Sequence, residues 1–243
     1  MTGSDHEVQI GTTPAPDSYW IEVSHNGPYI VHGAPPVTQA TIGTDAQGNS
    51  QDFVAGQSFP AKQTMALCRC GHSKNAPFCD SSHLTAGMDL TERASFAPLL
   101  QGAEEIDGPR LALTDNEKYC AFGRFCDVGQ GGVWNEVQLP GESHEKLTTH
   151  VSSHCPGGRL MAWDRTTGQP IEPAESASIH LIEDPAQGCS GPLMVRGGIR
   201  VQSGSGQSYE VRNRQALCRC GHSRNKPFCD GSHASVGYQD GIA

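Results

Sequence analysis

The sequence has few aromatic residues, little positive charge and no long apolar run. Aromatic side chains make up 6% of its 243 residues, and 17 lysines and arginines stand against 26 aspartates and glutamates. A formal net charge of −9 excludes the basic surface stripe of a nucleic-acid-binding protein. No apolar run approaches the roughly 18 residues of a membrane span, and no secretory or transit signal is visible at the start. These absences predict a protein that contacts neither nucleic acid nor a membrane.

Nucleotide-binding and hydrolase motifs are also missing. The sequence holds no Walker loop, no G-x-G-x-x-G after an expected strand and no G-x-S-x-G elbow. No substrate pocket can be argued from its residues, so we do not expect an enzyme. Glycine and proline are abundant instead, with 29 and 16 residues, and short alternating apolar runs lie between them. This pattern predicts a mainly β protein with short helices.

One 17-residue segment occurs twice. Residues 67–83 read LCRCGHSKNAPFCDSSH and residues 217–233 read LCRCGHSRNKPFCDGSH, which differ at three positions. Each copy sets three cysteines and a histidine in the order C-x-C-x8-C-x3-H. The candidate ligands are Cys68, Cys70, Cys79 and His83 in the first copy and Cys218, Cys220, Cys229 and His233 in the second. Thiolate and imidazole ligands at this close spacing suit zinc or an iron–sulfur cluster.

Zinc and a disulfide framework are the two alternatives to a cluster. Structural zinc sites often use three cysteines and one histidine, but two to four residues usually separate their first two cysteines, whereas one residue does so here. Disulfide bonding would not require a histidine at the same register in both copies. The spacing therefore favours a cluster over zinc, and makes disulfides the weakest of the three interpretations.

The wider pattern, C-x-C-x2-S-x3-P-x-C-D-x-S-H, resembles the signature of the CDGSH iron–sulfur family, in its tandem-motif soluble bacterial type. The further matching positions are Ser73, Pro77, Asp80 and Ser82 in the first copy and Ser223, Pro227, Asp230 and Ser232 in the second. One position departs, because Ser81 stands where the second copy keeps Gly231. The resemblance implies two 2Fe-2S clusters, one in each copy. It also implies that the C-x-C pair holds the inner iron and that the last cysteine and the histidine hold the outer iron.

Supporting residues in the loop have plausible functions. Asp80 and Asp230 are typical N-cap residues, and predict a short helix that places each ligand histidine on the same face as the cysteine four residues earlier. The hydroxyls of Ser73 and Ser223 are candidate donors to the sulfurs, with turn hydrogen bonding as the alternative. If the glycine position needs a positive φ, Ser81 is strained there and the first cluster should be lost sooner.

Histidine ligation implies a functional class. A neutral imidazole in place of a thiolate raises the reduction potential above that of all-cysteine ferredoxins, and its protonation near neutral pH makes the cluster acid-labile. We therefore predict an electron carrier with pH-sensitive redox chemistry that docks on redox partner proteins. The alternative is a protein that stores, transfers or senses labile clusters and delivers them to apo iron–sulfur acceptors. Free thiols and a labile site fit a reducing cytoplasm.

The repeat extends upstream of the ligands. GPYIVHG at 27–33 matches GPLMVRG at 191–197, and an apolar segment precedes each. CDGSH proteins are typically homodimers in which two chains share a β-cap above two cluster-binding loops. The resemblance therefore implies an intramolecular pseudo-dimer, monomeric and with internal pseudo-twofold symmetry. We expect a disordered tail over 1–17, a first CDGSH unit over 18–97, an insert over 98–178 and a second CDGSH unit over 179–243.

The insert carries three further cysteines, Cys120, Cys126 and Cys155, the last in HCPGGRL. This Cys-Pro-x-Gly pattern partly resembles the closing motif of divergent mono-cluster ferredoxin domains, which implies an α+β insert. The C-x2-C-x2-C run of such clusters is absent, so a fourth ligand would have to come from His150, His154 or Cys189. Whether the three cysteines bind a third metal centre or are buried structural cysteines stays open.

Overall fold

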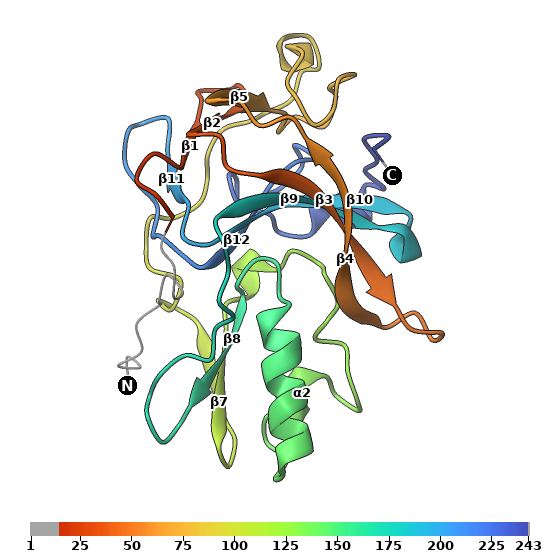
Figure 1. The fold of residues 1–243 in the computed structure, drawn as a ribbon, viewed down its shortest axis with the longest axis vertical. Helices are drawn as coiled ribbons and strands as arrows, with labels where there is room; N and C mark the ends of the chain where they lie inside the picture. Colours follow the sequence, from red (N-terminus) through yellow and green to blue (C-terminus); the bar gives the residue numbers. More distant parts are fainter. Residues whose placement is uncertain (1–14, 243) are drawn as a thin grey trace.

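The computed structural model describes residues 15–242, so most of the tail predicted over 1–17 lies outside the described residues. Three sheets and a few short helices make up the fold (Figure 1). The first sheet has the strand order β11-β1-β2-β5, with β1 at Trp20–Val23, β2 at Tyr29–His32, β5 at Thr64–Leu67 and β11 at Arg200–Gln202. The mainly β class predicted from the sequence is confirmed.

The second sheet is the larger one and faces the first. Its order is β12-β10-β9-β3-β4, with β3 at Val37–Thr44, β4 at Ser50–Phe59, β9 at Ser178–Asp184, β10 at Cys189–Arg196 and β12 at Arg214–Leu217. The inward faces of both sheets share one apolar core, because their strands alternate buried and less buried residues with the period of two that a pleated strand imposes. Residues of that core include Ile21, Val31, Leu67, Ile179, Val195 and Leu217.

The two sheets are built by strand exchange between the halves of the chain. β1 pairs in parallel with β11, and β3 pairs in parallel with β9. The registers correspond, since Ile21 lies opposite Val201 and Ile179 lies opposite Val37. The hairpins agree as well, because β2 pairs with β5 as β10 pairs with β12. An internal pseudo-twofold axis therefore relates the halves, which confirms the predicted intramolecular pseudo-dimer.

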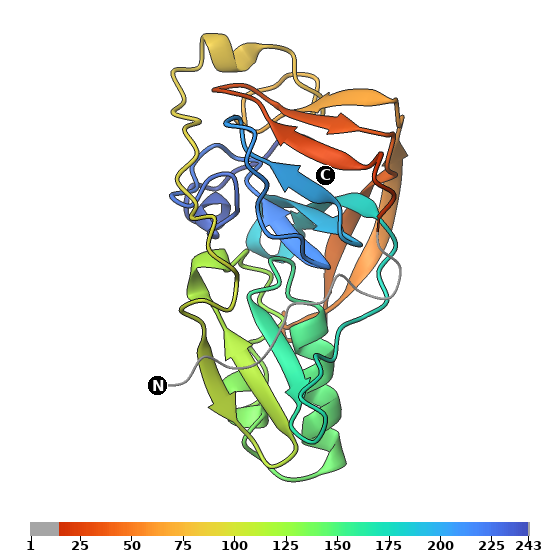
Figure 2. The same cartoon turned by 90° about the vertical axis from the view of Figure 1, so that its left-hand side faces the viewer.

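The insert forms the opposite end of the molecule (Figure 2). Its antiparallel sheet has the order β6-β7-β8, with β6 at Glu104–Asp107, β7 at Leu111–Asp115 and β8 at Leu160–Asp164. The remaining elements are the helices α1 at Val133–Glu136, α2 at Glu142–Ser153 and α3 at Ser232–Ser235, and the 3-10 turns η1 at Ser82–Leu84, η2 at Glu117–Tyr119 and η3 at Pro185–Gln187. None of the helices in residues 15–242 is both long and apolar enough to cross a membrane.

The halves differ in one strand pair. In the first half, β3 continues into the ten-residue strand β4, whereas the matching strand of the second half, β11, is followed only by an isolated bridge between Gln202 and Ser208. The long β3-β4 hairpin reaches the insert and shares a second apolar cluster with α2, to which Ile42, Phe53 and Val151 belong. The hairpin and the insert are thereby packed against each other.

Candidate metal centres

Each ligand loop leaves the last strand of its half and returns to it. The C-x-C pair follows β5 in the first half and β12 in the second, and the third cysteine folds back onto the same strand. The N–H of Cys79 donates to the carbonyl of Ala66, and the N–H of Cys229 donates to the carbonyl of Ala216, both at 2.8 Å. The strand therefore holds the first and third cysteines side by side in both copies.

All eight predicted ligands come together in two sets of four. In the first set, the Sγ atoms of Cys68 and Cys70 lie 3.6 Å apart, and Sγ of Cys79 lies 3.5 Å from Nδ1 of His83. In the second set, the corresponding distances are 3.8 Å for Cys218 and Cys220 and 3.5 Å for Cys229 and His233. Across residues 15–242, no three ligand atoms of either set lie within 4.8 Å of one another. Each set is thus two separate pairs.

Backbone N–H groups surround the thiols. A hydrogen bond from the Cys70 thiol lowers the pKa of Cys68 to about 5, assisted by the N–H groups of Ser73 and Gly71. The pKa of Cys218 is lowered to about 7, first by a hydrogen bond from Cys220. The pKa values of the other thiols are raised, those of Cys70 and Cys220 first by their hydrogen bonds to the neighbouring cysteine and those of Cys79 and Cys229 first by burial. Each loop without metal therefore favours one thiolate, and metal binding would have to displace the protons of the other two cysteines.

The polar residues shared by the two ligand loops form hydrogen bonds with the loop backbone. The Ser73 hydroxyl donates to the Phe78 carbonyl at 2.6 Å, and Ser223 does the same to Phe228, so these hydroxyls serve the turn rather than the sulfurs. Asp80 accepts the N–H of Lys74 at 2.9 Å and the N–H of Ser82 at 3.0 Å. The predicted N-cap role of Asp80 is wrong by one residue, because the turn η1 is preceded directly by Ser81.

The first and second sets differ in exposure. Cys79 and His83 are partly exposed, whereas Cys229 and His233 are each 3% exposed. A loop of the insert covers the second set: Ala121 packs with Cys229, and the Phe122 ring lies edge-on to His233 with 6.5 Å between the ring centroids. Burial, with a smaller contribution from Arg219, lowers the pKa of His233 to about 4. The whole second set is therefore shielded from solvent, whereas in the first set only Cys68 and Cys70 are.

The two ligand loops meet at the pseudo-twofold axis. A Cβ on Gly71 would lie 2.6 Å from the Cys220 carbonyl oxygen, and a Cβ on Gly221 would lie 2.7 Å from that of Cys70. Both glycines have a positive φ, +77° and +80°. Only residues without a side chain permit this approach of backbone to backbone, so the inner cysteines of the two sets lie on either side of one tight contact.

A residue of the first half also forms hydrogen bonds with the ligand loop of the second half. The Tyr29 hydroxyl, on β2 of the first half, lies in the second loop with the carbonyl oxygens of Cys218 at 2.8 Å and Pro227 at 3.0 Å as its acceptors. Tyr29 is fully buried, so the loop of the second set depends on a residue of the first half.

The three cysteines of the insert line one small cavity between the loop at 120–126 and α2. Burial raises the pKa of Cys126 to about 12 and also raises the pKa of Cys155. None of the three residues considered as a fourth ligand, His150, His154 and Cys189, lines this cavity. The three cysteines thus line one cavity, and the three residues considered as a fourth ligand lie outside its lining.

Comparison with known proteins identifies the repeated segments. The family model described as iron-binding zinc finger, CDGSH type, matches residues 26–84 and 190–234, which contain all eight ligands. The insert lies outside both matches. No curated protein and no solved structure matches the chain. These two matches are consistent with a tandem CDGSH protein, and CDGSH domains imply an iron–sulfur protein.

Proposed function

We propose that the protein binds two 2Fe-2S clusters, each through three cysteines and one histidine, and that it acts as a monomeric electron carrier in the cytoplasm. The observation that carries the proposal is the division of each ligand set into two pairs, at 3.6 and 3.5 Å in the first loop. Three sulfurs at about 2.3 Å and one nitrogen at about 2.0 Å around one zinc ion would all lie roughly 3.5 to 3.8 Å from one another. Two irons with two protein ligands each fit separated pairs.

Backbone groups and the histidine ring would have different functions around each cluster. When bound, the cluster supplies a one-electron couple. Backbone N–H groups donate to the thiolates and stabilise negative charge, as Ser81 and Gly231 do toward Cys79 and Cys229, both at 3.4 Å. Nδ1 of His83 faces the Cys79 sulfur, so Nδ1 is the nitrogen that would bind iron and Nε2 would carry the ring proton. A partly exposed ring lets a proton compete with iron for Nδ1, which supports pH-sensitive chemistry at the first site.

The contact between the two loops supports a relay within one chain. Because the backbone of Gly71 touches that of Cys220, and the backbone of Gly221 touches that of Cys70, the two loops are in direct backbone contact, with the side chains of Tyr238 and Met88 beside it. The first loop is open to solvent and the second lies under the insert. We therefore infer that a redox partner docks at the first loop and that the second site exchanges electrons through the first.

Delivery of labile clusters is the second candidate, and the exposure of Cys79 and His83 favours it. A transfer protein must let an acceptor thiol reach the cluster, and only the first loop offers such access. The second set, with His233 at 3% exposure, is placed for retention. Under this alternative, the first cluster would be cargo and the second would be permanent.

The metal content of the purified protein tests the cluster assignment. We expect about four irons, four sulfides and a coloured spectrum. A colourless protein with about two zinc ions would overturn the proposal. Iron clearly above four would indicate a further metal site outside the two ligand loops.

Mixing the loaded protein with an apo-ferredoxin separates the two functions. A carrier should keep both clusters and be reduced quickly by a reductase, as followed by visible circular dichroism of the separated proteins. Complete movement of clusters without a chelator would contradict the carrier and support transfer. Movement of only the first cluster would support the mixed alternative.

A further inference from the structure

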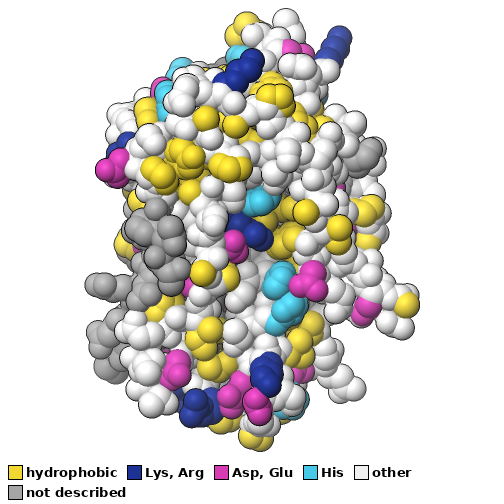
Figure 3. Space-filling view, viewed as in Figure 1, with side chains coloured by type: hydrophobic (Ala, Val, Ile, Leu, Met, Phe, Trp, Pro, Cys, Tyr) yellow, Lys and Arg dark blue, Asp and Glu magenta, His cyan; other side chains and the backbone are white. Residues whose placement is uncertain are grey.

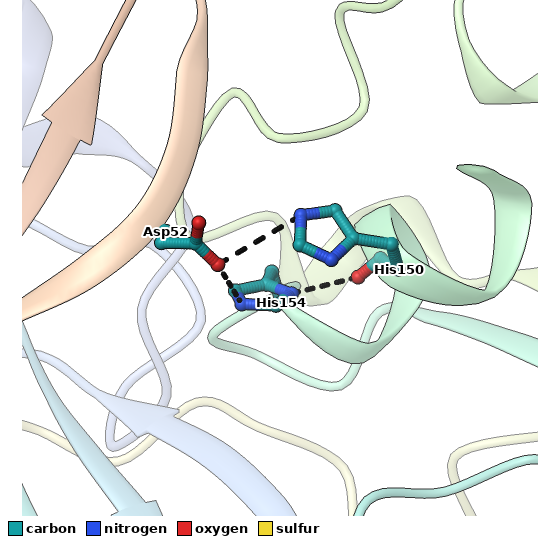
Figure 4. Close-up of side chains that lie close together, drawn as sticks. All are labelled: Asp52, His150 and His154. Carbon is teal, nitrogen blue, oxygen red and sulfur yellow. Dashed lines mark hydrogen bonds and ion pairs between the residues drawn. The ribbon is translucent and has the colours of Figure 1, made fainter. Parts of the chain in front are cut away.

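Three potential metal ligands outside both cluster loops meet between β4 and α2 (Figure 4). Asp52 lies near the start of β4, and His150 and His154 lie one turn apart at the end of α2. One ligand atom from each lies within 4.8 Å of the other two, and no other three histidine, cysteine or acidic residues in 15–242 meet this condition. Oδ1 of Asp52 lies 3.2 Å from Nε2 of His154 and 3.9 Å from Nε2 of His150.

The ring of His154 is oriented as a ligand would be. Its Nδ1 donates to the carbonyl oxygen of His150 at 2.8 Å, which leaves the Nε2 lone pair directed at the Asp52 carboxylate. Metal-binding histidines are commonly fixed by such a bond from the second ring nitrogen to a carbonyl. The geometry therefore presents two acceptor atoms to one point.

The surroundings of the His154 ring favour its neutral form, which is the form that binds metals. Phe53 and Phe125 flank it, with ring centroids 5.9 and 5.2 Å away, and burial lowers its pKa. The neighbouring charged groups are Asp52, His150 and Arg196, of which only Asp52 favours protonation. Nε2 of His154 and the carboxylate oxygen of Asp52 lie 3.2 Å apart, and either a proton on the ring or a cation bound by both atoms satisfies the pair.

Access and electrostatics agree with a bound cation. The side chain of Asp52 is 69% exposed and that of His154 is 23% exposed, so an ion can enter from solvent. Histidine and acidic side chains lie next to each other on this face, over α2 and β4 (Figure 3). The negative end of the α2 dipole points at the same place, since α2 ends at Ser153. Nε2 of His150 donates to the carbonyl oxygen of Gln51 at 3.0 Å, so a metal bound by Nε2 would replace this proton and lie close to the carbonyl oxygen.

The ligands are held by packed elements. Asp52 precedes Phe53, which packs in the same apolar cluster as Leu147 and Val151 of α2. Two histidines at i and i+4 on a helix share one face and are a common pair of metal ligands. Because β4 has no counterpart of its length in the second half, this site is not a repeat of the cluster loops.

We propose that Asp52, His150 and His154 bind one divalent transition-metal ion, such as Zn²⁺, with at least one position left for water. Two imidazoles and a carboxylate suit zinc and its neighbours, and an open position is typical of sites where the metal acts as a Lewis acid. The ion would also tie the hairpin of the first half to the insert. It is distinct from the iron–sulfur centres, which use thiolates.

Binding of cobalt(II) and zinc to the cluster-loaded protein tests the site, because filled cluster loops cannot take up the added ion. We expect one equivalent by calorimetry, and an X-ray absorption spectrum with nitrogen and oxygen neighbours but no sulfur. Asp52→Asn and His154→Gln should each weaken binding at least tenfold. His144→Gln is the matched control, because His144 lies on the same helix but pairs with Glu136 at 2.6 Å, and it should leave affinity unchanged.

Three results would overturn the proposal: no saturable binding to the wild-type protein, sulfur in the metal's coordination shell, or equal affinities for wild type and the two ligand variants. The visible cluster spectrum of each variant serves as the folding control. Since Asp52 is largely exposed, Asp52→Asn should keep that spectrum, and the absorption measurement on wild type stands independently of any variant.

Discussion

At the residue scale, the two ligand loops share one left-handed backbone position but not its residue. Ser81 has φ 70° and ψ 10°, and Gly231 has φ 83° and ψ −3°. A Cβ at Gly231 would lie 3.3 Å from the Cys120 carbonyl oxygen and from Cβ of Phe122. The insert loop therefore leaves little room for a side chain in the second copy. The first copy accepts serine at a strain of about 1 kcal/mol.

Exchanging the residues at this position should change the rates of cluster loss at the two sites in opposite directions. Ser81→Gly relieves strain, so we expect the faster phase of cluster loss to slow by about fivefold, the equivalent of about 1 kcal/mol. Gly231→Ser should instead speed the slower phase, because its side chain meets the insert loop. Visible absorbance during chelator challenge records both phases. An unchanged fast phase in Ser81→Gly would contradict the strain.

Histidine ligation should set acid lability. His83→Cys and His233→Cys replace a ligand that protonation displaces with a thiolate, so each should slow acid loss of its own cluster and lower its potential. Stopped-flow jumps from pH 7 to pH 5 and protein-film voltammetry provide the two readouts. Unchanged kinetics in both variants would refute the role of the imidazole.

At the element scale, the loop of the insert at 120–126 gives the two ligand sets different solvent exposure, although their sequences are nearly the same. Burial lowers the pKa of His233 to about 4, whereas the unfolded chain takes up this proton near pH 6.5. The stabilisation that depends on a neutral His233 is therefore present above about pH 6.5 and is lost as the pH falls toward 4. We expect the second cluster to survive to lower pH than the first.

Removing the cover tests this difference. Phe122→Ala opens the space beside the His233 ring, so the slow phase of acid loss should approach the rate of the fast phase. The first cluster of the same molecule is the internal control, and its rate should not change. A slow phase that keeps its wild-type rate would show that the insert does not protect the second site.

At the scale of the whole molecule, strand exchange and the contact between the loops make the halves one folding unit. β11 completes the sheet of the first half, β3 joins that of the second, and Tyr29 binds the second ligand loop. A change at the pseudo-twofold axis should therefore affect both clusters, although it lies in one loop.

Two glycine substitutions isolate that contact. Gly71→Ala places a Cβ 2.6 Å from the Cys220 carbonyl, whereas Gly87→Ala has a similar positive φ, +65°, and no atom within 4 Å of the added Cβ. Both carry backbone strain of roughly 1 kcal/mol, but only Gly71→Ala should cost about 2 kcal/mol more and speed loss of both clusters. Urea unfolding and chelator challenge measure these effects. Equal destabilisation by the two variants would exclude a tight contact between the loops.

Sequence alone determined the repeat and the candidate ligands, because cluster chemistry needs particular side chains at short spacing within one loop. The pseudo-dimer and the positive φ at Ser81 were predictable from the sequence, and the assignment of the eight candidate ligands to iron stays a prediction. The Ser73 hydroxyl was not, since a turn carbonyl and a sulfur are equally plausible acceptors until the loop geometry is known.

Only the tertiary structure decided what depends on contacts between distant segments. The cover of Phe122 on His233, the meeting of Gly71 with Cys220 and the approach of Asp52 to His154 join residues roughly 100 or more positions apart. The i and i+4 spacing of His150 and His154 was visible in the sequence, but their third partner lies on a hairpin of the other half. Side-chain chemistry is local and can be read from spacing, whereas shielding and convergence are set by how the packed core brings separate elements together.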